Sequence, residues 1–435
     1  MWSWKKQRSL AFAFLIGFVG LLWGGVVWRL THSAPHPLTV LYTFPSVGWK
    51  GVNDGGAHPS SLILGQDGTL YGTASNGGPY GQGVVFRLDP RSNRYTVLHS
   101  FHAFQDGVLP KNLLQARNGL LYGIVYGGPT GAGALFAMKP DGSAYRILHP
   151  FSVGDGTPST ELLEGPDGFL YGTTSLGYQS SAVYRIAPDG SRYQVLYRFT
   201  NKGYPSSETL LLENRSLYEL IAYLHEPISR PYPSWALIKI DLDQGRIQVS
   251  HRPSWIANSL SPSPPTEGFY LWLSTSKETA LYRLQPSRFA FQRLYALHSS
   301  HGNVVAPVGS PVMGSDGALY GGLRFVHYPR PVFIPINSPF ANIDSSAIFR
   351  LNADGSHFKI LYRFSQAPSH SPPSLVTKLQ QFFHLHHALQ GEPLFPEGAS
   401  PDRLVLGGNN TLYGISAQGG LNNSGTIFRL QLPSL

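Results

Sequence analysis

The chain has 435 residues, no cysteine and a formal net charge of +9. The lack of cysteine excludes disulfides, thiolate metal sites and a lipidated cysteine anchor, and the basic residues are too scattered to form the patch that binds nucleic acid. Aromatic residues make up 13% of the chain, which argues against disorder, and 48 glycines with 35 prolines are typical of short strands joined by tight turns. We therefore expect a large β architecture without a cofactor, a bound metal or a nucleic acid partner.

The N-terminal segment from Leu10 to Trp28 is apolar throughout. A helix of about 19 residues spans roughly 28 Å, which is close to the hydrocarbon thickness of a bilayer. Lys5, Lys6 and Arg8 precede the segment, and such positive flanks stay on the cytoplasmic side. The sequence therefore predicts one transmembrane helix with its N-terminus inside and the lipid bilayer as its partner.

The competing interpretation of this segment is a cleaved signal peptide, with a candidate cleavage site after Ala34. Pro35 follows that site and would obstruct cleavage. We therefore predict a cytoplasmic stretch at 1–9, a signal anchor at 10–28 and a linker at 29–37. Both interpretations place the rest of the chain outside the cytoplasm, in the periplasm or the extracellular space.

A short phrase, Asp-Gly-Thr-Leu-Tyr-Gly, begins at Asp67 and returns four times with small changes. The copies lie at 67–72, 118–123, 167–172, 316–321 and 410–414. The second and third copies place their tyrosines 49 residues apart, and a period near this length is the mark of a repeat architecture. We expect Gly72, the last residue of the phrase, to make room for an adjacent repeat.

One full unit predicts four strands. In the first unit they are Ser61–Gly65, Thr69–Ala74, Val84–Leu88 and Tyr95–Phe101. An Asp-Gly turn separates the first two strands, and in several units another separates the last two. Asp-Gly between alternating apolar runs is a strong hairpin signal, because glycine accepts the positive φ that these turns require.

The second-strand tyrosines count seven units. They are Tyr71, Tyr122, Tyr171, Tyr218, Tyr270, Tyr320 and Tyr413. The fourth and fifth units are degenerate, since Glu219 and Leu271 replace the glycine after the tyrosine. The expected first strand of the fifth unit falls in Ser261–Pro265, which is proline-rich and poor strand material.

The last unit lacks a fourth strand, whereas Leu38–Phe44 repeats the fourth-strand phrase with no unit before it. A ring in which this first strand completes the last unit resolves both observations. The sequence therefore predicts an all-β, seven-bladed propeller of four-stranded antiparallel blades at 38–435, closed by the N-terminal strand.

The pattern Asp-Gly-x-Leu-Tyr-Gly-Thr, Gly-Gly, Val-Phe-Arg-Leu and Pro-Asp-Gly-Ser resembles the GloVer repeat of the choice-of-anchor tandem-repeat proteins. The fourth and fifth units depart from this pattern. The resemblance implies a bacterial, exported, envelope-attached propeller protein. It implies no catalytic residue.

Antiparallel connectivity predicts which face of the ring carries function. The first and third turns of every blade share one face, while the second turns and the links between blades share the other. All long insertions fall on the second face, including an inserted loop with a short amphipathic helix at 365–402. Since function concentrates on loops held by a rigid scaffold, we expect binding on that face.

Candidate binding residues on this face fall into two groups. The acids that precede innermost strands could border the mouth of the central channel and bind sugar hydroxyls, or they could simply form turns. They are Asp54, Asp106, Asp155 and Glu397. The second group belongs to an insertion in the sixth unit and comprises Tyr328, Arg330 and Phe333.

The function that these features favour is that of a monomeric, non-catalytic ring that binds a glycan, a peptide or an envelope partner. The alternative is a propeller hydrolase or lyase that acts on glycans through carboxylates at the channel mouth. His384, His386 and His387 do not converge as metal ligands on a helix, and no nucleophile elbow of the Gly-x-Ser-x-Gly type is present.

Overall fold

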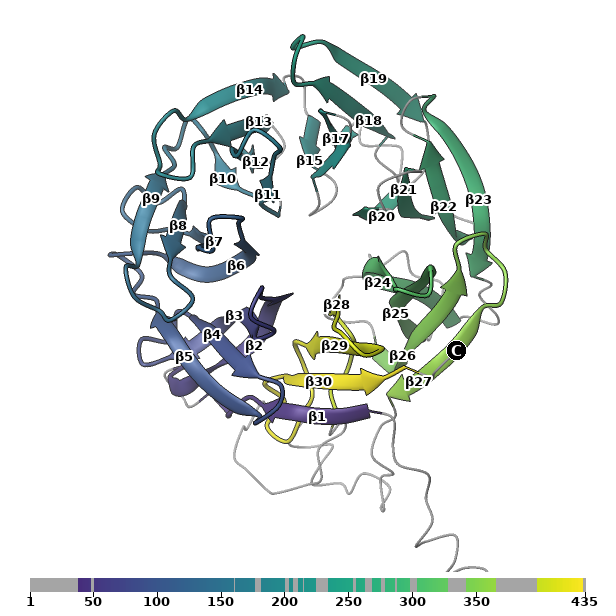
Figure 1. The fold of residues 1–435 in the computed structure, drawn as a ribbon, viewed down its shortest axis with the longest axis horizontal. Coiled ribbons are helices and arrows are strands. Elements are labelled where there is room, and N and C mark those ends of the chain that lie inside the picture. Colours follow the sequence, from purple (N-terminus) through teal and green to yellow (C-terminus); the bar gives the residue numbers. More distant parts are fainter. Residues whose placement is uncertain are drawn as a thin grey trace, which may run out of the picture. The chain divides into compact units, whose positions relative to one another are not determined.

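The computed structural model describes residues 38–432 with internal gaps (Figure 1). The gaps are 48–50, 160, 177–180, 200–202, 206–209, 214, 224–233, 253–255, 263–267, 275–277, 286–287, 298–302, 328–341 and 365–396. The chain divides into the units Met1–Thr39 and Val40–Leu435, and only the second is described at length. The predicted segments 1–9, 10–28 and 29–37 lie outside the described residues.

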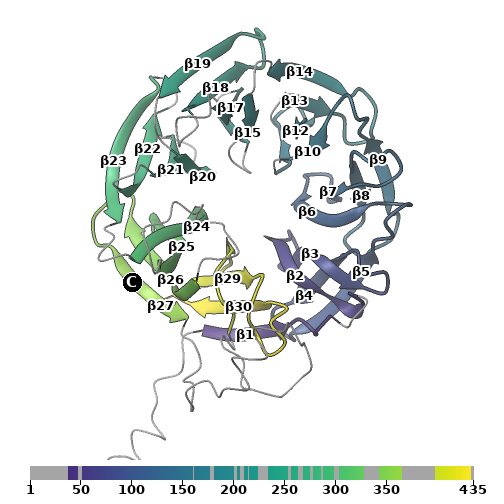
Figure 2. The ribbon, with the colours of Figure 1, turned by 180° about the vertical axis from the view of Figure 1, so that it is seen from behind.

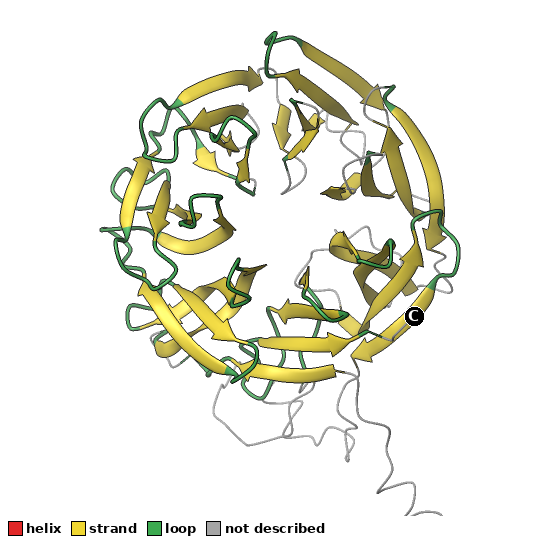
Figure 3. Cartoon of the chain, in the orientation of Figure 1, coloured by secondary structure: helices red, strands yellow, loops and turns green. Residues whose placement is uncertain are grey.

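The second unit is a ring of seven β-sheets, so the predicted seven-bladed propeller is confirmed (Figures 1, 2 and 3). Each sheet is antiparallel, and its first strand lies innermost and its fourth outermost. Within the described part of the chain no helix is long and apolar enough to span a membrane.

The strands of the first three blades follow the repeat closely. Blade 1 consists of β2 (Asn53–Leu64), β3 (Leu70–Gly78), β4 (Val84–Asp89) and β5 (Arg94–Ser100); blade 2 of β6 (Val108–Gln115), β7 (Leu121–Tyr126), β8 (Ala134–Met138) and β9 (Arg146–Pro150); blade 3 of β10 (Thr157–Pro158), β11 (Leu163–Glu164), β12 (Leu170–Ser175), β13 (Ser181–Ile186) and β14 (Gln194–Phe199). In blade 3 the innermost strand is divided into β10 and β11, which both pair with β12.

The remaining blades include the two degenerate units. Blade 4 consists of β15 (Gly203–Pro205), β16 (Leu211–Glu213), β17 (Ser216–Tyr223), β18 (Ser234–Asp241) and β19 (Ile247–Arg252); blade 5 of β20 (Ile256–Pro262), β21 (Phe269–Ser274), β22 (Thr279–Gln285) and β23 (Ala290–Leu297); blade 6 of β24 (Asn303–Met313), β25 (Ala318–His327), β26 (Asn342–Asn352) and β27 (Lys359–Phe364); blade 7 of β28 (Arg403–Leu406), β29 (Thr411–Ser416), β30 (Thr426–Gln431) and β1 (Leu38–Thr43). The innermost strand of blade 5 begins five residues before the predicted Ser261–Pro265 and ends at Pro262, which pairs with Phe269 of β21.

The ring closes through β1, which pairs with β30 as the outermost strand of blade 7. Phe44, just after β1, donates its backbone N–H to the Gly425 carbonyl at 3.1 Å. Leu41 and Phe44 are buried against residues of blades 1 and 7 in one hydrophobic cluster. The two ends of the chain therefore share one blade, as the sequence predicted.

The glycine of the repeated phrase has a different role from the expected one. A Cβ on Gly72 would lie 2.4 Å from Cζ of Phe86, which stands opposite on β4 of the same blade. The same pairing of glycine with a third-strand aromatic ring recurs in four other blades, as Gly123 with Phe136, Gly172 with Tyr184, Gly321 with Phe349 and Gly414 with Phe428. The glycine therefore makes room for its own blade's aromatic ring.

The degenerate blades obey the same rule. In blade 4, Glu219 replaces the glycine and the opposing residue is Ile238, a smaller side chain. In blade 5, Leu271 stands opposite Tyr282, which is only half-buried. Loss of the glycine thus accompanies loss of a fully buried opposing ring.

Neighbouring blades are joined by stacked rings that lie on their outermost strands or directly before them. Tyr42 of β1 stacks on Tyr95 of β5 with ring centroids 3.9 Å apart. The equivalent pairs at later junctions are His99 with Tyr145 at 3.7 Å, His149 with Tyr193 at 4.1 Å and Tyr295 with Phe358 at 4.5 Å. We refer to these four pairs as the inter-blade stacks.

The predicted Asp-Gly turns are confirmed in the first hairpins, where Gly68, for example, has φ = 77°. Asp67 accepts hydrogen bonds from the Thr69 N–H at 3.0 Å and from the Tyr71 hydroxyl at 2.9 Å. Burial, followed by the bond to Asp67, raises the pKa of Tyr71 to about 12. The tyrosine therefore remains a donor, and the repeated aspartate and tyrosine are structural.

The glycine–ring pairing predicts the effect of Gly123→Ala. All three nearest atoms to a Cβ at this position belong to the Phe136 ring, the closest at 2.4 Å. We expect a loss of about 1–3 kcal/mol of stability from overpacking, measured by denaturant unfolding of the purified chain.

A second substitution, Phe136→Ile, reproduces the smaller partner seen in blade 4 and should cost less in the Gly123→Ala background than alone. Gly408→Ala is the control, since a Cβ there meets nothing within 4 Å. Strictly additive costs for the two substitutions would contradict the pairing.

Candidate functional site

The two faces of the ring differ in chemistry. We call the face with the first and third turns the turn face, and the face with the second turns and the inter-blade links the loop face. The described turns of the turn face carry charges of both signs, such as Arg91, Arg117, Asp141 and Asp189. In the described loops of the loop face all the charged side chains are acidic, and they are Asp106, Asp155, Glu278, Glu397 and Asp402.

Exposed apolar side chains gather on the loop face. Seven large apolar residues are exposed within the described part of the chain, and six of them lie in or beside the loops of this face. We call these six the loop-face apolar residues: Val52, Tyr80, Phe104, Leu109, Val153 and Leu421. Phe104 is 86% exposed and Leu421 69% exposed, so water covers most of each side chain. The seventh, Val249, lies on the outermost strand of blade 4.

The loop-face apolar residues follow consecutive blades. Leu421 belongs to the second turn of blade 7, Tyr80 to that of blade 1, Phe104 to the link into blade 2 and Val153 to the link into blade 3. The Tyr80 ring rests edge-on against His102, with centroids 4.9 Å apart. Because these loops belong to adjacent blades of the ring, the residues form an arc over blades 7, 1, 2 and 3.

Two of the predicted carboxylates are held beside outermost strands. Asp106 accepts a hydrogen bond from the His102 N–H at 2.6 Å and lies 2.7 Å from Nε2 of His99 on β5. Glu397 accepts a hydrogen bond from the hydroxyl of Tyr362 on β27. His99 and Tyr362 occupy the same position of the repeat, so both acids bond to the outer aromatic residue of the preceding blade.

The other two predicted acids are placed differently. Asp155 accepts hydrogen bonds from the N–H and hydroxyl of Ser152, at 3.1 and 2.6 Å, and so closes its own turn. Asp54 is exposed at the start of β2. The contacts of Asp106, Asp155 and Glu397 join each acid to its own junction and bring no two of the three together. Tyr328, Arg330 and Phe333 lie outside the described residues, as does 375–391, where the helix was predicted.

Charged residues that the prediction missed lie on the innermost strands. Arg403 of β28 in blade 7 forms an ion pair with Glu161, which lies between β10 and β11 in blade 3. The partners are 242 positions apart and their blades are not adjacent, so the pair crosses the central channel. Burial lowers the pKa of Arg403 to about 10, which still leaves it charged at neutral pH.

A second ion pair lies beside the first. Arg324 of β25 donates through Nη2 to Asp402 at 3.3 Å and to the Ser400 hydroxyl at 3.2 Å. Asp402 also accepts the Ala417 N–H at 2.6 Å, while burial raises the pKa of its carboxyl. Each charge in these two pairs has an opposite charge beside it. The first pair joins the innermost strands of blades 3 and 7, and the second joins the second strand of blade 6 to the residue before β28.

The sequence did hold a signal for the first pair. Ten residues before the second-strand tyrosine, the third, fourth and seventh units have the charged residues Glu161, Glu208 and Arg403, and Arg403 is the one basic residue at this position. Nothing in the sequence, however, indicates that blades 3 and 7 contact each other. Among the described residues, no group of three or more His, Asp or Glu side chains is placed to hold a metal ion.

Residues 19–223 match the family model of the Gloeobacter/Verrucomicrobia repeat. The match covers 205 of the 435 residues and agrees with the repeat seen in the sequence. The match ends within blade 4. The later copies of the repeat are identified by their strands, and in blades 6 and 7 also by the glycine–ring pairing. No curated protein matches the sequence.

Solved structures with the propeller fold resemble this chain at low identity. An oligogalacturonate lyase from Vibrio parahaemolyticus is 10% identical, with a TM-score of 0.55 over 91% of this chain and 94% of its own. An oligogalacturonate lyase in complex with manganese is also 10% identical, with a TM-score of 0.51 over 87% of this chain and 90% of its own. At such identity the likeness supports the fold alone.

His149 predicts a pH dependence of stability. Burial lowers the pKa of this histidine, against a smaller opposing effect of Asp155, and Nε2 is buried without a hydrogen-bond partner beside the Tyr193 ring. Because the folded-state pKa lies below the unfolded value of about 6.5, the unfolded chain takes up the proton more readily, and stability falls as the pH drops below that value.

Tyrosine occupies the equivalent position at Tyr42, Tyr197, Tyr295 and Tyr362, so His149→Tyr keeps the ring and removes the titration. We expect the melting temperature to fall less for His149→Tyr than for the wild type between about pH 7 and pH 5.5. Identical pH profiles for the two proteins would show that His149 does not titrate in this way.

Proposed function

We propose that the chain is a membrane-anchored propeller that binds a glycan, a peptide or an envelope partner through its loop face, without catalysis. The observation that carries the proposal is the position of the exposed apolar side chains, six of seven on one face within the described part of the chain. Exposed apolar groups cost free energy in water, and their concentration on one face is typical of an interaction surface.

The charges on the loop face support a partner that is not strongly anionic. The described loops of this face carry acidic side chains and no lysine or arginine. Asp106, Asp155 and Glu397 are already hydrogen-bonded within the chain. Contact with the partner then rests on Tyr80, Phe104 and their neighbours, which supply apolar area from rigidly held loops.

Binding is tested with a variant that carries Tyr80→Ser, Phe104→Ser and Leu421→Ser. We expect the wild-type chain to bind saturably to one component of a glycan array or to a purified envelope protein. The triple variant should lose at least roughly tenfold in affinity, because three exposed apolar contacts are removed at once.

Val249→Ser is the matched control, since Val249 is the exposed apolar residue that lies away from the loop face. It should leave binding unchanged. Equal binding by the triple variant and the wild type, or no saturable binding by the wild type, would refute the proposed surface.

The anchoring part of the proposal rests on the sequence of residues 10–28. Their apolar length matches a bilayer, and the preceding basic residues favour a cytoplasmic N-terminus. The loop face would then act outside the cytoplasm, on the bacterial cell surface or in the periplasm.

Topology is tested by reporters fused after Leu435. A reporter that folds only in the periplasm should be active, and one that is active only in the cytoplasm should be silent. The reverse pattern would overturn the proposed orientation.

A further inference from the structure

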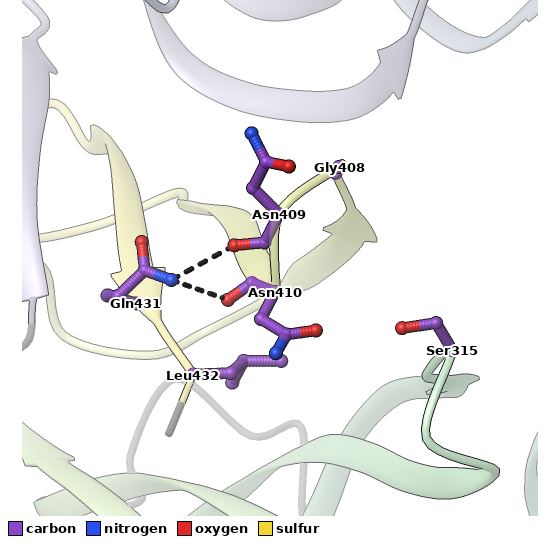
Figure 4. Close-up of a pocket in the computed structure, with 7 residues that line it drawn as sticks. Ser315, Gly408, Asn409, Asn410, Gln431 and Leu432 are labelled. Carbon is purple, nitrogen blue, oxygen red and sulfur yellow. Dashed lines mark hydrogen bonds between the residues drawn. The ribbon is translucent and has the colours of Figure 1, made fainter. Parts of the chain in front are cut away.

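A cavity opens on the turn face between blades 6 and 7, opposite the proposed binding surface (Figure 4). Its volume is about 500 Å³, within the range of small-molecule sites. The lining comes from the first turn of blade 7, from Ser315 in the first turn of blade 6, and from Gln431 and Leu432 at the end of β30. The side chains of Asn410 and Ser315 face each other across the opening in Figure 4.

The blade 7 turn departs from its sister turns at the two positions that face this cavity. In blades 1, 3 and 6 the corresponding residues are Asp-Gly, and the aspartate is tied to the second-strand tyrosine, as in the bond of Asp67 with Tyr71. Blade 7 has Asn409 and Asn410 instead, with φ values of 55° and 53°. Asparagine enters the left-handed region more readily than other non-glycine residues, so this turn forms without glycine and presents two carboxamide side chains that the other turns lack.

The blade 7 turn is hydrogen-bonded to the last residue of β30. Gln431 donates through Nε2 to the carbonyls of Asn409 and Asn410, at 3.0 and 3.2 Å (Figure 4). With both carbonyls occupied in this way, the asparagine side chains are not needed to close the turn. Asn409 points away from Gln431 and Asn410 points toward Ser315.

The chemistry of the lining selects the ligand class. The cavity is bordered by carboxamide, hydroxyl and backbone groups and by the Leu432 side chain, and none of its lining residues is charged. Carboxamides both donate and accept hydrogen bonds, which suits a ligand with several hydroxyl groups. We propose that this cavity is a binding site for a neutral sugar of one or two rings, separate from the loop face.

The test uses the full chain in a detergent without a sugar head group and saturation-transfer NMR with glucose, galactose, N-acetylglucosamine and cellobiose. We expect one of these sugars to bind at millimolar concentration and galacturonate, as a charged comparator, to bind more weakly. Absence of binding by all four neutral sugars would overturn the proposal.

The decisive variant carries Asn409→Asp and Asn410→Gly, which gives blade 7 the Asp-Gly turn of blades 1, 3 and 6. Because glycine accepts positive φ and the new carboxylate can accept the Tyr413 hydroxyl, we expect an unchanged or higher melting temperature. Sugar affinity should fall by roughly tenfold or more, since hydrogen-bonding carboxamides are lost.

Ser315→Ala removes one hydroxyl without touching the blade 7 turn and should weaken binding less. Wild-type affinity in the double variant would place any sugar binding elsewhere, including the loop face. The triple loop-face variant, with Tyr80, Phe104 and Leu421 changed to serine, should bind the sugar normally, so the two surfaces are tested independently.

Discussion

The pairing of β1 with β30 is the interaction on which the rest of the ring depends. It joins the first described strand of the chain to the last, and it places Leu41 and Phe44 in the hydrophobic cluster between blades 7 and 1. Tyr42 then stacks on Tyr95, as the outer residues of later blades stack on theirs. Without β1, blade 7 would expose the edge of β30 and blade 1 would lose its stacked neighbour.

Much of this architecture could be predicted because the same local sequence signals recur in several units. The turn glycines and the second-strand tyrosines predict the number of blades. The fourth-strand phrase at Leu38–Phe44, which has no unit before it, predicts how the ring closes. Blades 4 and 5 keep the fold although Glu219 and Leu271 replace the glycine, because Ile238 and Tyr282 oppose these residues in place of a fully buried ring. The role of Gly72 could not be predicted, since its nearest contact, Phe86, is defined by strand register.

The candidate site was harder to predict, because it depends on contacts between distant parts of the sequence. Position in the repeat identified Asp106 and Glu397, but their partners lie on the preceding blade's outermost strand. The pair of Glu161 with Arg403 crosses the channel and follows from no local pattern. The loop-face apolar residues escaped notice because each stands alone in sequence and the face is assembled from four blades.

Repetition and function are thus separated in this chain. Residues that recur, such as the aspartate–tyrosine bonds and the inter-blade stacks, maintain the ring. Residues that break the pattern, such as Phe104 on the loop face and Asn409 with Asn410 on the turn face, are the ones we propose to contact ligands. This division holds only if the ring is closed and the loops keep fixed positions.

Amide hydrogen exchange in β30 tests closure most directly. In the full chain, Leu41→Asp with Phe44→Asp places two charges in the buried junction, and Thr39→Asp, at an exposed position of the same strand, is the control. Exchange across Thr426–Gln431 should accelerate by roughly tenfold or more in the double variant while β7 stays protected, because opening begins at the seam. Unchanged protection of β30 in the double variant would contradict a ring that is closed by its first strand.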